Sequence, residues 1–223
     1  MPLPPRVSIV GASGALGQGL ARRWAAAGIP LALGSREADR AQATADELSA
    51  AVAGADLESG ENAAVAGAAP VVAVAVPFAA QAQTYASIAE ALAPGTVVLD
   101  ATVPLATAVG GKPTRTLGVW QGSAAQQAAS LVPDGVNVVS ALHTVSAALL
   151  ADPEHRFDED VLVCGDDKEA KATVAALVEA IEGLRAVDAG PLDQSRIAES
   201  LTALMIGINI RNKTHAGIRI TGL

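Results

Sequence analysis

The feature that most constrains the fold of this chain is a glycine-rich turn between an apolar strand and an amphipathic helix. Val7 to Val10 are apolar and β-prone, and the run GASGALG interrupts them. A helical stretch from Leu16 to Ala27 follows, with apolar side chains at every fourth position, and Leu31 to Leu33 form a second short strand. This order predicts a βαβ unit over residues 6–34.

The alternation of strands and helices continues along the chain. Residues 54–62 are rich in glycine and charge and are expected to loop out, and residues 103–122 are expected to pass over the sheet edge. The pattern predicts an α/β fold: a Rossmann-type doubly wound parallel sheet with a small C-terminal α/β and helical segment. The further strands are expected at residues 71–76, 96–100, 136–140, 161–164 and 185–188, and the further helices at 40–52, 79–92, 124–132, 167–181 and 195–212.

The character of the sequence changes after Ala147, where a charged stretch precedes another α/β unit. We expect a nucleotide-binding domain over residues 1–147 and a small C-terminal domain over residues 148–223, which either continues the sheet or sits beside it. The last helix places apolar residues on one side, which suits a dimer contact or packing on its own domain. These residues are Ile197, Leu201, Leu204 and Ile208.

Charge and composition narrow the possible partners. A net charge of -8 argues against nucleic-acid binding, because neutralising phosphates requires clustered Lys and Arg. From Gln194 onward, however, the chain has four basic residues and one acidic residue. This basic end is either a solvated terminus or a binding site for an anion.

Targeting, membrane and metal signals are not expected. Cys164 is the only cysteine, so no intrachain disulfide can form and a reducing, cytoplasmic setting is expected. No leader and no membrane span are expected, because the N-terminus enters a strand directly and apolar runs break before about 18 residues. The histidines do not have metal-ligand spacing, so no metal is expected.

The glycine turn has the mechanics of a dinucleotide phosphate site. Ala12 stands where the G-x-G-x-x-G pattern has its first glycine, so the fingerprint is a variant. Gly14 would let the backbone approach a pyrophosphate, and Gly17 would let the helix and strand pack closely. The helix N-terminus would add unpaired N–H groups, so we expect dinucleotide binding rather than a merely structural turn.

The second strand predicts which dinucleotide binds. An NAD site places an acidic residue about 20 positions after the fingerprint, but Ser35 and Arg36 occupy this place. Ser35, Arg36 and Arg40, one helical turn further on, would hold a 2'-phosphate through hydrogen bonds and charge. The sequence therefore favours NADP, although Glu37 and Asp39 would oppose this if they paired with the arginines.

The nicotinamide is expected at the carboxyl ends of the central strands. Val76 ends one of these strands, Val103 follows the next, and a third runs into SALHTVSA, which contains His143. His143 is a candidate for proton transfer, or it only donates a hydrogen bond to a ring carbonyl. The tyrosine–lysine pair of short-chain dehydrogenases is missing, since Tyr85 is followed four residues later by Ala89. The sequence therefore shows no dedicated proton donor. This is reasonable if the second substrate is itself a redox cofactor that accepts hydride directly.

Taken in order, SIVGASGALGQGLARRWAAAG, LGSREADRA, SALHTVSAA, VCGDD, DAGPLDQSR, ESLTALMIGIN and HAGIRITGL resemble the NADPH-dependent reductases of the deazaflavin coenzyme F420. The resemblance covers nearly the whole chain. It implies direct hydride transfer between nicotinamide C4 and deazaflavin C5, and a homodimer. It also implies that Ser13, Gly14, Ala15 and Leu16 hold the pyrophosphate.

The resemblance implies further roles for residues around the rings. Val76, Val103 and Ala147 would border the nicotinamide, His143 and Val145 would flank the stacked rings, and Ala216 would lie near the site. Arg211, Lys213 or Arg219 would attract the phosphate and glutamate tail of F420. Two alternatives stay open: an NADP-dependent reductase of a small imine or keto acid, and a nonenzymatic NADP sensor.

Overall fold

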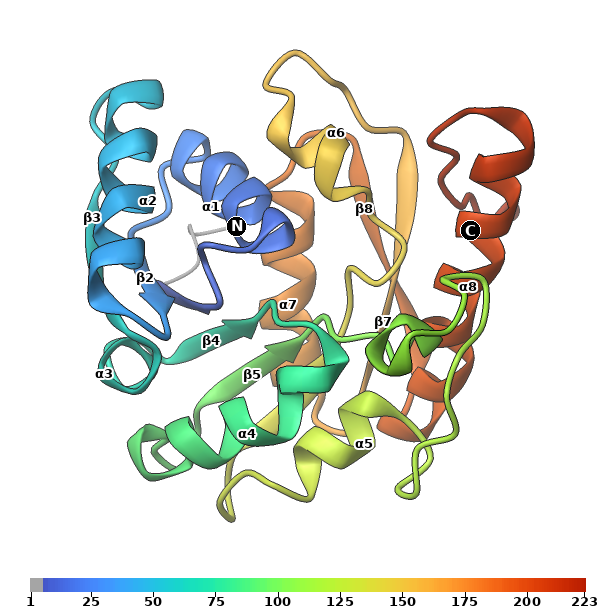
Figure 1. The fold of residues 1–223 in the computed structure, drawn as a ribbon, viewed down its shortest axis with the longest axis horizontal. Coiled ribbons are helices and arrows are strands. Elements are labelled where there is room, and N and C mark those ends of the chain that lie inside the picture. The colour runs from blue at the N-terminus through green and yellow to red at the C-terminus, as the bar shows by residue number, and fades with distance from the viewer. Residues whose placement is uncertain (1–5) are drawn as a thin grey trace.

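The buried strands expected from the sequence meet in one eight-stranded sheet in the computed structural model, which describes residues 6–223 (Figure 1). Residues 1–5, where the absence of a leader was expected, lie outside the described residues. The strands are β1 (Val7–Val10), β2 (Leu31–Ser35), β3 (Leu57–Glu61), β4 (Val71–Val74), β5 (Val97–Asp100), β6 (Asn137–Ser140), β7 (Glu159–Gly165) and β8 (Leu184–Gly190).

The strand order is β3-β2-β1-β4-β5-β6-β7-β8. Every neighbouring pair is parallel except β6 and β7, which are antiparallel. The order reverses between β1 and β4, so the carboxyl ends of these two strands flank the crevice where doubly wound sheets bind ligands. The C-terminal α/β unit continues the sheet through β7 and β8, which decides between the two arrangements left open.

Helices cover both faces of the sheet. Figure 1 shows α1 and α2 on one side and α4 and α5 on the other. Trp24 of α1 donates from Nε1 to the carbonyl of Leu177 in α7 at 2.9 Å, which joins two helices of the same layer. The helices are α1 (Ala15–Ala26), α2 (Ala38–Ala51), α3 (Asn62–Ala66), α4 (Phe78–Ile88), α5 (Ala124–Ala129), α6 (Ala147–Ala151), α7 (Lys168–Glu179) and α8 (Ser195–Asn212), with short 3-10 turns η1 (Ala89–Ala91), η2 (Ala106–Val109) and η3 (Leu192–Gln194).

The core has two parts, one on each face of the sheet. Alternate side chains of a strand enter different parts: Ile9 of β1 packs with Leu20 of α1, whereas Val10 packs with Tyr85 and Ile88 of α4. Because both faces are buried, the central strands are almost wholly apolar. Within residues 6–223, no helix is both long and apolar enough to cross a membrane.

One expected loop is wrong. Residues 54–62 contain β3, which pairs in parallel with β2 from Leu57 to Glu61. This strand lies at the sheet edge and its residues are only partly buried or exposed, so it has neither an apolar run nor alternation. The short helices α3 and α6 were also not expected, because five residues are too few to show a helical period.

Candidate functional site at the carboxyl ends of the strands

The glycine turn after β1 passes very close to the end of β4. Gly11 has a φ of +82°, and a Cβ on it would lie 2.7 Å from the Cγ1 atom of Val76. A Cβ on Gly17 would collide with the carbonyl oxygen of Gly11, so only glycine lets α1 begin directly against the turn. The expected role of Gly17 in close packing of helix and strand is confirmed.

The N-terminus of α1 has the features of an anion-binding helix end. Gly14 is the N-cap and has no side chain to satisfy the first N–H groups, and the first turn carries no acidic residue. In any α-helix the first four N–H groups have no intrahelical partner. The N–H of Gly14 donates to the carbonyl of Gly11 at 3.0 Å. Within residues 6–223, the unpaired donors beside the turn are therefore those of Ser13, Ala15 and Leu16, at the positive end of the helix dipole.

A pocket of about 480 Å³ adjoins this turn and brings together residues from four elements. The hydroxyl oxygens of Ser13 and Ser35 lie 3.1 Å apart. The predicted residues that line the pocket are Ser13, Gly14, Ser35, Arg36, Arg40 and Val76. The structure therefore assembles the glycine turn and the proposed phosphate-binding side chains around one space.

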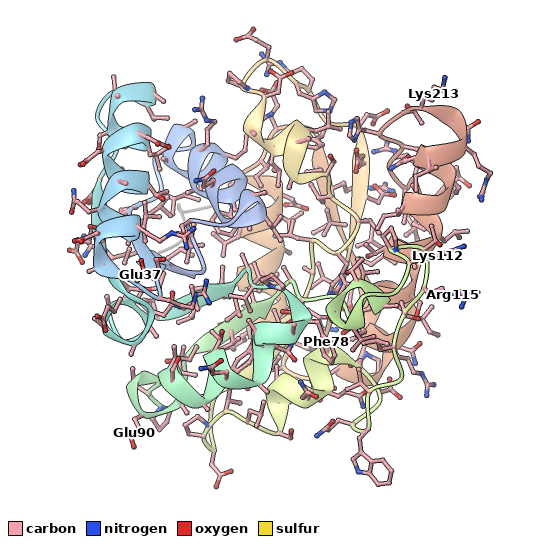
Figure 2. The ribbon with its side chains drawn as sticks, viewed as in Figure 1. Glu37, Phe78, Glu90, Lys112, Arg115 and Lys213 are labelled. Atoms are coloured by element: carbon pink, nitrogen blue, oxygen red, sulfur yellow. The ribbon has the colours of Figure 1, made fainter. Side chains whose placement is uncertain are left out.

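Both arginines are available to an anion. Arg36 and Arg40 are exposed, and among residues 6–223 neither forms an ion pair with a carboxylate. The neighbouring acids Glu37 and Asp39 are also exposed, and neither forms an ion pair with these arginines. Figure 2 shows Glu37 at the start of α2. The arrangement argues against neutralisation of the arginines as surface pairs.

Asn62 is a pocket residue that the sequence did not reveal. Its side-chain oxygen accepts a hydrogen bond from the N–H of Gly11 at 3.1 Å, and the residue is only 7% exposed. Asn62 therefore holds the glycine turn in place and also lines the pocket. No motif marks it, since it follows the unexpected strand β3.

A buried polar network fixes the end of β5. Asp100 accepts hydrogen bonds from the hydroxyl of Tyr85 at 2.6 Å, from Nε2 of Gln81 at 2.9 Å and from the N–H of Thr102 at 2.8 Å. Burial raises the pKa of the Asp100 carboxyl. The network orders the turn that leads into Val103.

Val103 and Ala147, expected beside the nicotinamide, follow the ends of β5 and β6. They line neither the pocket at the glycine turn nor a second pocket beside α8.

A second pocket, of about 560 Å³, lies between the segment after β6 and the end of α8. The segment after β6 supplies both predicted ring-flanking residues, His143 and Val145. From α8 and the chain that follows it come Thr202, Met205, Ile206, Asn209, Ile210, Lys213, Thr214 and His215. Because β1, β4, β5 and β6 are parallel, this segment and the glycine turn both start at the carboxyl ends of the strands.

His143 is held as a neutral imidazole. It is 8% exposed, burial lowers its pKa to about 4, and its Nε2 atom has no hydrogen-bond partner. The preceding residue, Leu142, has a φ of +67°, and Thr202 of α8 donates to the carbonyl of His143 at 2.9 Å. A non-glycine residue in this conformation marks a backbone held by its surroundings.

The basic residues near the end of the chain differ in whether they form ion pairs. Arg219 lies 3.1 Å from Asp158 and 3.5 Å from Asp160, so its charge is used within the protein. Lys213 and Arg211 form no ion pair among residues 6–223, and Lys213 lines the second pocket. Ala216 lies beside this pocket, with its N–H donating to the side-chain oxygen of Asn209 at 2.8 Å.

Comparisons with known proteins agree with this geometry. Residues 6–104 match the family described as NADP oxidoreductase, coenzyme F420-dependent. An F420-dependent NADP reductase of Methanothermobacter thermautotrophicus is 39% identical, with 98% of this chain and 95% of the relative covered. One from Methanocaldococcus jannaschii is also 39% identical, over 98% and 99% of the two chains.

Solved structures show the same fold. A crystal structure from Arthrobacter sp. fb24, assigned as an F420-dependent NADP-reductase, has a TM-score of 0.81 at 26% identity and covers 96% of this chain and 99% of its own. An imine reductase of Streptomyces aurantiacus shares the fold alone, with a TM-score of 0.57 at 20% identity over 92% of this chain but only 60% of its own. From its near full-length relatives, this chain belongs to the family of F420-dependent NADP reductases.

Proposed function

We propose that this protein transfers a hydride reversibly and directly between NADP(H) and the deazaflavin coenzyme F420. The observation that carries the proposal is the first pocket, where Ser35, Arg36 and Arg40 face the glycine turn and no acidic residue takes the place expected for NAD. Relatives of this chain are named F420-dependent NADP reductase, which supports F420 as the second substrate.

The residues of the first pocket would divide the dinucleotide between them. Ser13, Gly14, Ala15 and Leu16 would bind the pyrophosphate, with backbone N–H groups donated by Ser13, Ala15 and Leu16. Ser35, Arg36 and Arg40 would bind the 2'-phosphate. Val76, Val103 and Ala147 would border the nicotinamide at the strand ends. The chemistry of the bound pair is hydride transfer between nicotinamide C4 and deazaflavin C5.

The second pocket would receive the deazaflavin. His143 and Val145 would flank its ring, with the neutral imidazole of His143 positioning the ring through its free Nε2 rather than supplying a proton from an imidazolium. Arg211 and Lys213 are the basic residues left for the anionic end of F420, because Arg219 is paired. Residues 148–223 would form the deazaflavin cleft together with residues 143–146, and residues 1–147 would form the NADP-binding domain.

Association and location follow from the same proposal. A homodimer would cover Ile197 and Leu204, which lie on one side of α8 and are 56% and 54% exposed.

Both redox substrates would be small molecules. A cytoplasmic location would fit the single, buried Cys164, because a reducing compartment keeps thiols free.

The alternatives have less support. The imine reductase fold match leaves 40% of that enzyme uncovered, so this chain has no counterpart to a large part of it. A nonenzymatic NADP sensor would need the first pocket but not the second, where His143 keeps an unpaired buried nitrogen.

Mixing the protein with NADPH and oxidised F420 tests the proposal. We expect the deazaflavin absorbance to fall at the rate at which NADPH is oxidised, in one-to-one proportion. Tight NADPH binding without turnover would favour the sensor. Oxidation of NADPH only with an imine or keto acid would favour the other enzyme.

A further inference from the structure

The end of the chain is bound to the start of β7 through one buried carboxylate. Asp160 is 1% exposed, and Arg185 of β8 donates to both of its oxygens, from Nε at 2.8 Å and from Nη2 at 2.7 Å. This two-point pair holds the pKa of Asp160 down, at about 2. The carboxylate is therefore ionised over the whole range in which the protein would be assayed.

The same residue also binds the chain terminus. The N–H of Ile220 donates to Oδ2 of Asp160 at 2.5 Å, and the N–H of Asp160 donates to the carbonyl of Ile218 at 2.7 Å. Arg185 adds bonds to the carbonyl of Ile220 at 2.9 Å and to that of Leu223 at 3.1 Å. Asp160 and Arg185 thus form an anchor for residues 218–223.

Two further contacts seat the tail closely. The guanidinium of Arg219 lies 3.1 Å from Asp158, and a Cβ on Gly217 would collide with the side chain of Glu159. Glu159 is only 8% exposed, so its side chain has little room to move away. The tail is therefore fitted against β7 as well as hydrogen-bonded to it.

The other end of this tail forms a wall of the second pocket. Lys213 ends α8 in a left-handed conformation, with φ at +52°, and turns the chain back; Figure 2 shows it at the end of that helix. Asn209 accepts from the N–H of Ala216 at 2.8 Å, and Nδ1 of His215 lies 3.2 Å from the hydroxyl of Ser146. Lys213, Thr214 and His215 line the pocket, so this wall is held between α8 and the anchored residues.

We propose that Asp160 and Arg185 are positioning residues for the deazaflavin substrate: they tether residues 218–223 and so hold Lys213 to His215 as a preformed wall of the second pocket. The inference rests on the proposed function. An untethered terminus is mobile, and ordering it during binding would cost affinity for whichever substrate uses that wall. The dinucleotide pocket contains no residue of the tail, so NADPH binding is independent of the anchor.

The test compares two variants that release the tail in different ways. Asp160→Asn removes the charge from the anchor, and Gly217→Val leaves the anchor intact but forces the exposed tail away from Glu159. Arg156→Gln is the matched control, because it removes a guanidinium from an exposed ion pair with Glu182 that does not touch the tail. Should Asp160→Asn not fold, Gly217→Val still decides the matter.

For both tail variants we expect the F420 KM to rise about tenfold or more, while kcat at saturating F420 and the NADPH Kd stay within about twofold of the wild type. Trypsin should cleave after Lys213 at least about tenfold faster, because cleavage follows the opened population. The control should match the wild type in every measurement.

An unchanged F420 KM in a variant whose tail trypsin cleaves rapidly would overturn the inference. So would an equal loss of NADPH and F420 binding, which would show a general structural role. Failure of the wild-type protein to reduce F420 with NADPH would instead contradict the proposed function, and the proteolysis result would still report whether the anchor holds the tail.

Discussion

The proposed preference for NADP over NAD depends on three side chains, those of Ser35, Arg36 and Arg40. Ser35 is 3% exposed at the end of β2, whereas both arginines are exposed and unpaired among residues 6–223. A guanidinium that already paired with a carboxylate would have to exchange partners to bind phosphate, and here no such exchange is needed. A phosphate gains two charge-assisted interactions that a ribose hydroxyl cannot make.

Substitution of Arg36→Ala should weaken NADPH binding about tenfold to a hundredfold and leave NADH binding nearly unchanged, since hydrogen bonds to charged groups contribute about 1.5–3 kcal/mol. Fluorescence titration with each dinucleotide measures this. Arg22→Ala, on α1 but outside the first pocket, is the control. Equal weakening of both dinucleotides would refute the assignment of the phosphate site.

Burial of His143 should make stability depend on pH. Its pKa falls from 6.5 to about 4 in the folded protein, so between these values the unfolded chain binds a proton that the folded protein does not. The free energy of unfolding therefore decreases as pH falls through this window, by about 3 kcal/mol in all. His143→Gln should remove this part of the acid sensitivity in denaturant titrations at pH 7 and pH 5, and His155→Gln should not.

The same neutrality limits what His143 does in turnover. We expect His143→Ala to lower kcat no more than about tenfold, because a neutral imidazole that only positions a ring contributes less than a proton donor. Steady-state kinetics over pH 6 to 8 test this. A loss of several orders of magnitude would identify His143 as an acid.

Among the elements, α8 is joined to α5 by one buried side chain. Glu199 accepts hydrogen bonds from the N–H groups of Ala124 at 2.9 Å and Ala125 at 3.0 Å. Burial raises the pKa of Glu199 from 4.5 to about 7, so folding favours its protonated form. This contribution to stability is complete below pH 4.5 and is lost as pH rises through 7.

Replacing Glu199→Gln should therefore flatten the change of unfolding free energy between pH 4.5 and pH 7, because glutamine does not titrate. It should also remove one of the two bonds to α5, since an amide has a single accepting oxygen. Thermal unfolding across this pH range is the measurement, with the exposed Glu90→Gln on η1 as control. An unchanged pH profile would show that Glu199 does not titrate in this window.

The elements also show what the sequence could predict. The central strands β1, β4 and β5 were predictable because they are largely buried on both faces and almost wholly apolar. β3 was not, because an edge strand with partly exposed residues has no such pattern. Asn62 was missed for the same reason: its role depends on β3 bringing it next to the glycine turn.

For the whole molecule, the proposed dimer contact on α8 makes a direct prediction. The protein should sediment with twice the mass of one 22.2 kDa chain. Leu204→Glu should shift it toward the monomer, because a charge on an apolar interface is costly to bury. Ala51→Glu, at the exposed end of α2, should leave the mass unchanged. A wild-type monomer at micromolar concentration would contradict the dimer.

The sequence predicted a doubly wound sheet, but not how the C-terminal segment completes the second pocket. The run HAGIRITGL carried the resemblance, yet only the fold shows that Gly217 and Arg219 fasten the tail to β7. Such contacts join residues about 60 positions apart, as between Asp160 and Ile220. Local periodicity carries no information about them.

The proposed function depends on direct hydride transfer between the two substrates. A single turnover of the enzyme with NADPH deuterated at C4, in separate experiments for each face of the nicotinamide, measures it directly when the reduced F420 is analysed by mass spectrometry and NMR. Direct transfer predicts that one of the two labelled forms delivers its deuterium to C5 of the deazaflavin without dilution by solvent. Reduced F420 with no deuterium at C5 from either labelled form would contradict it.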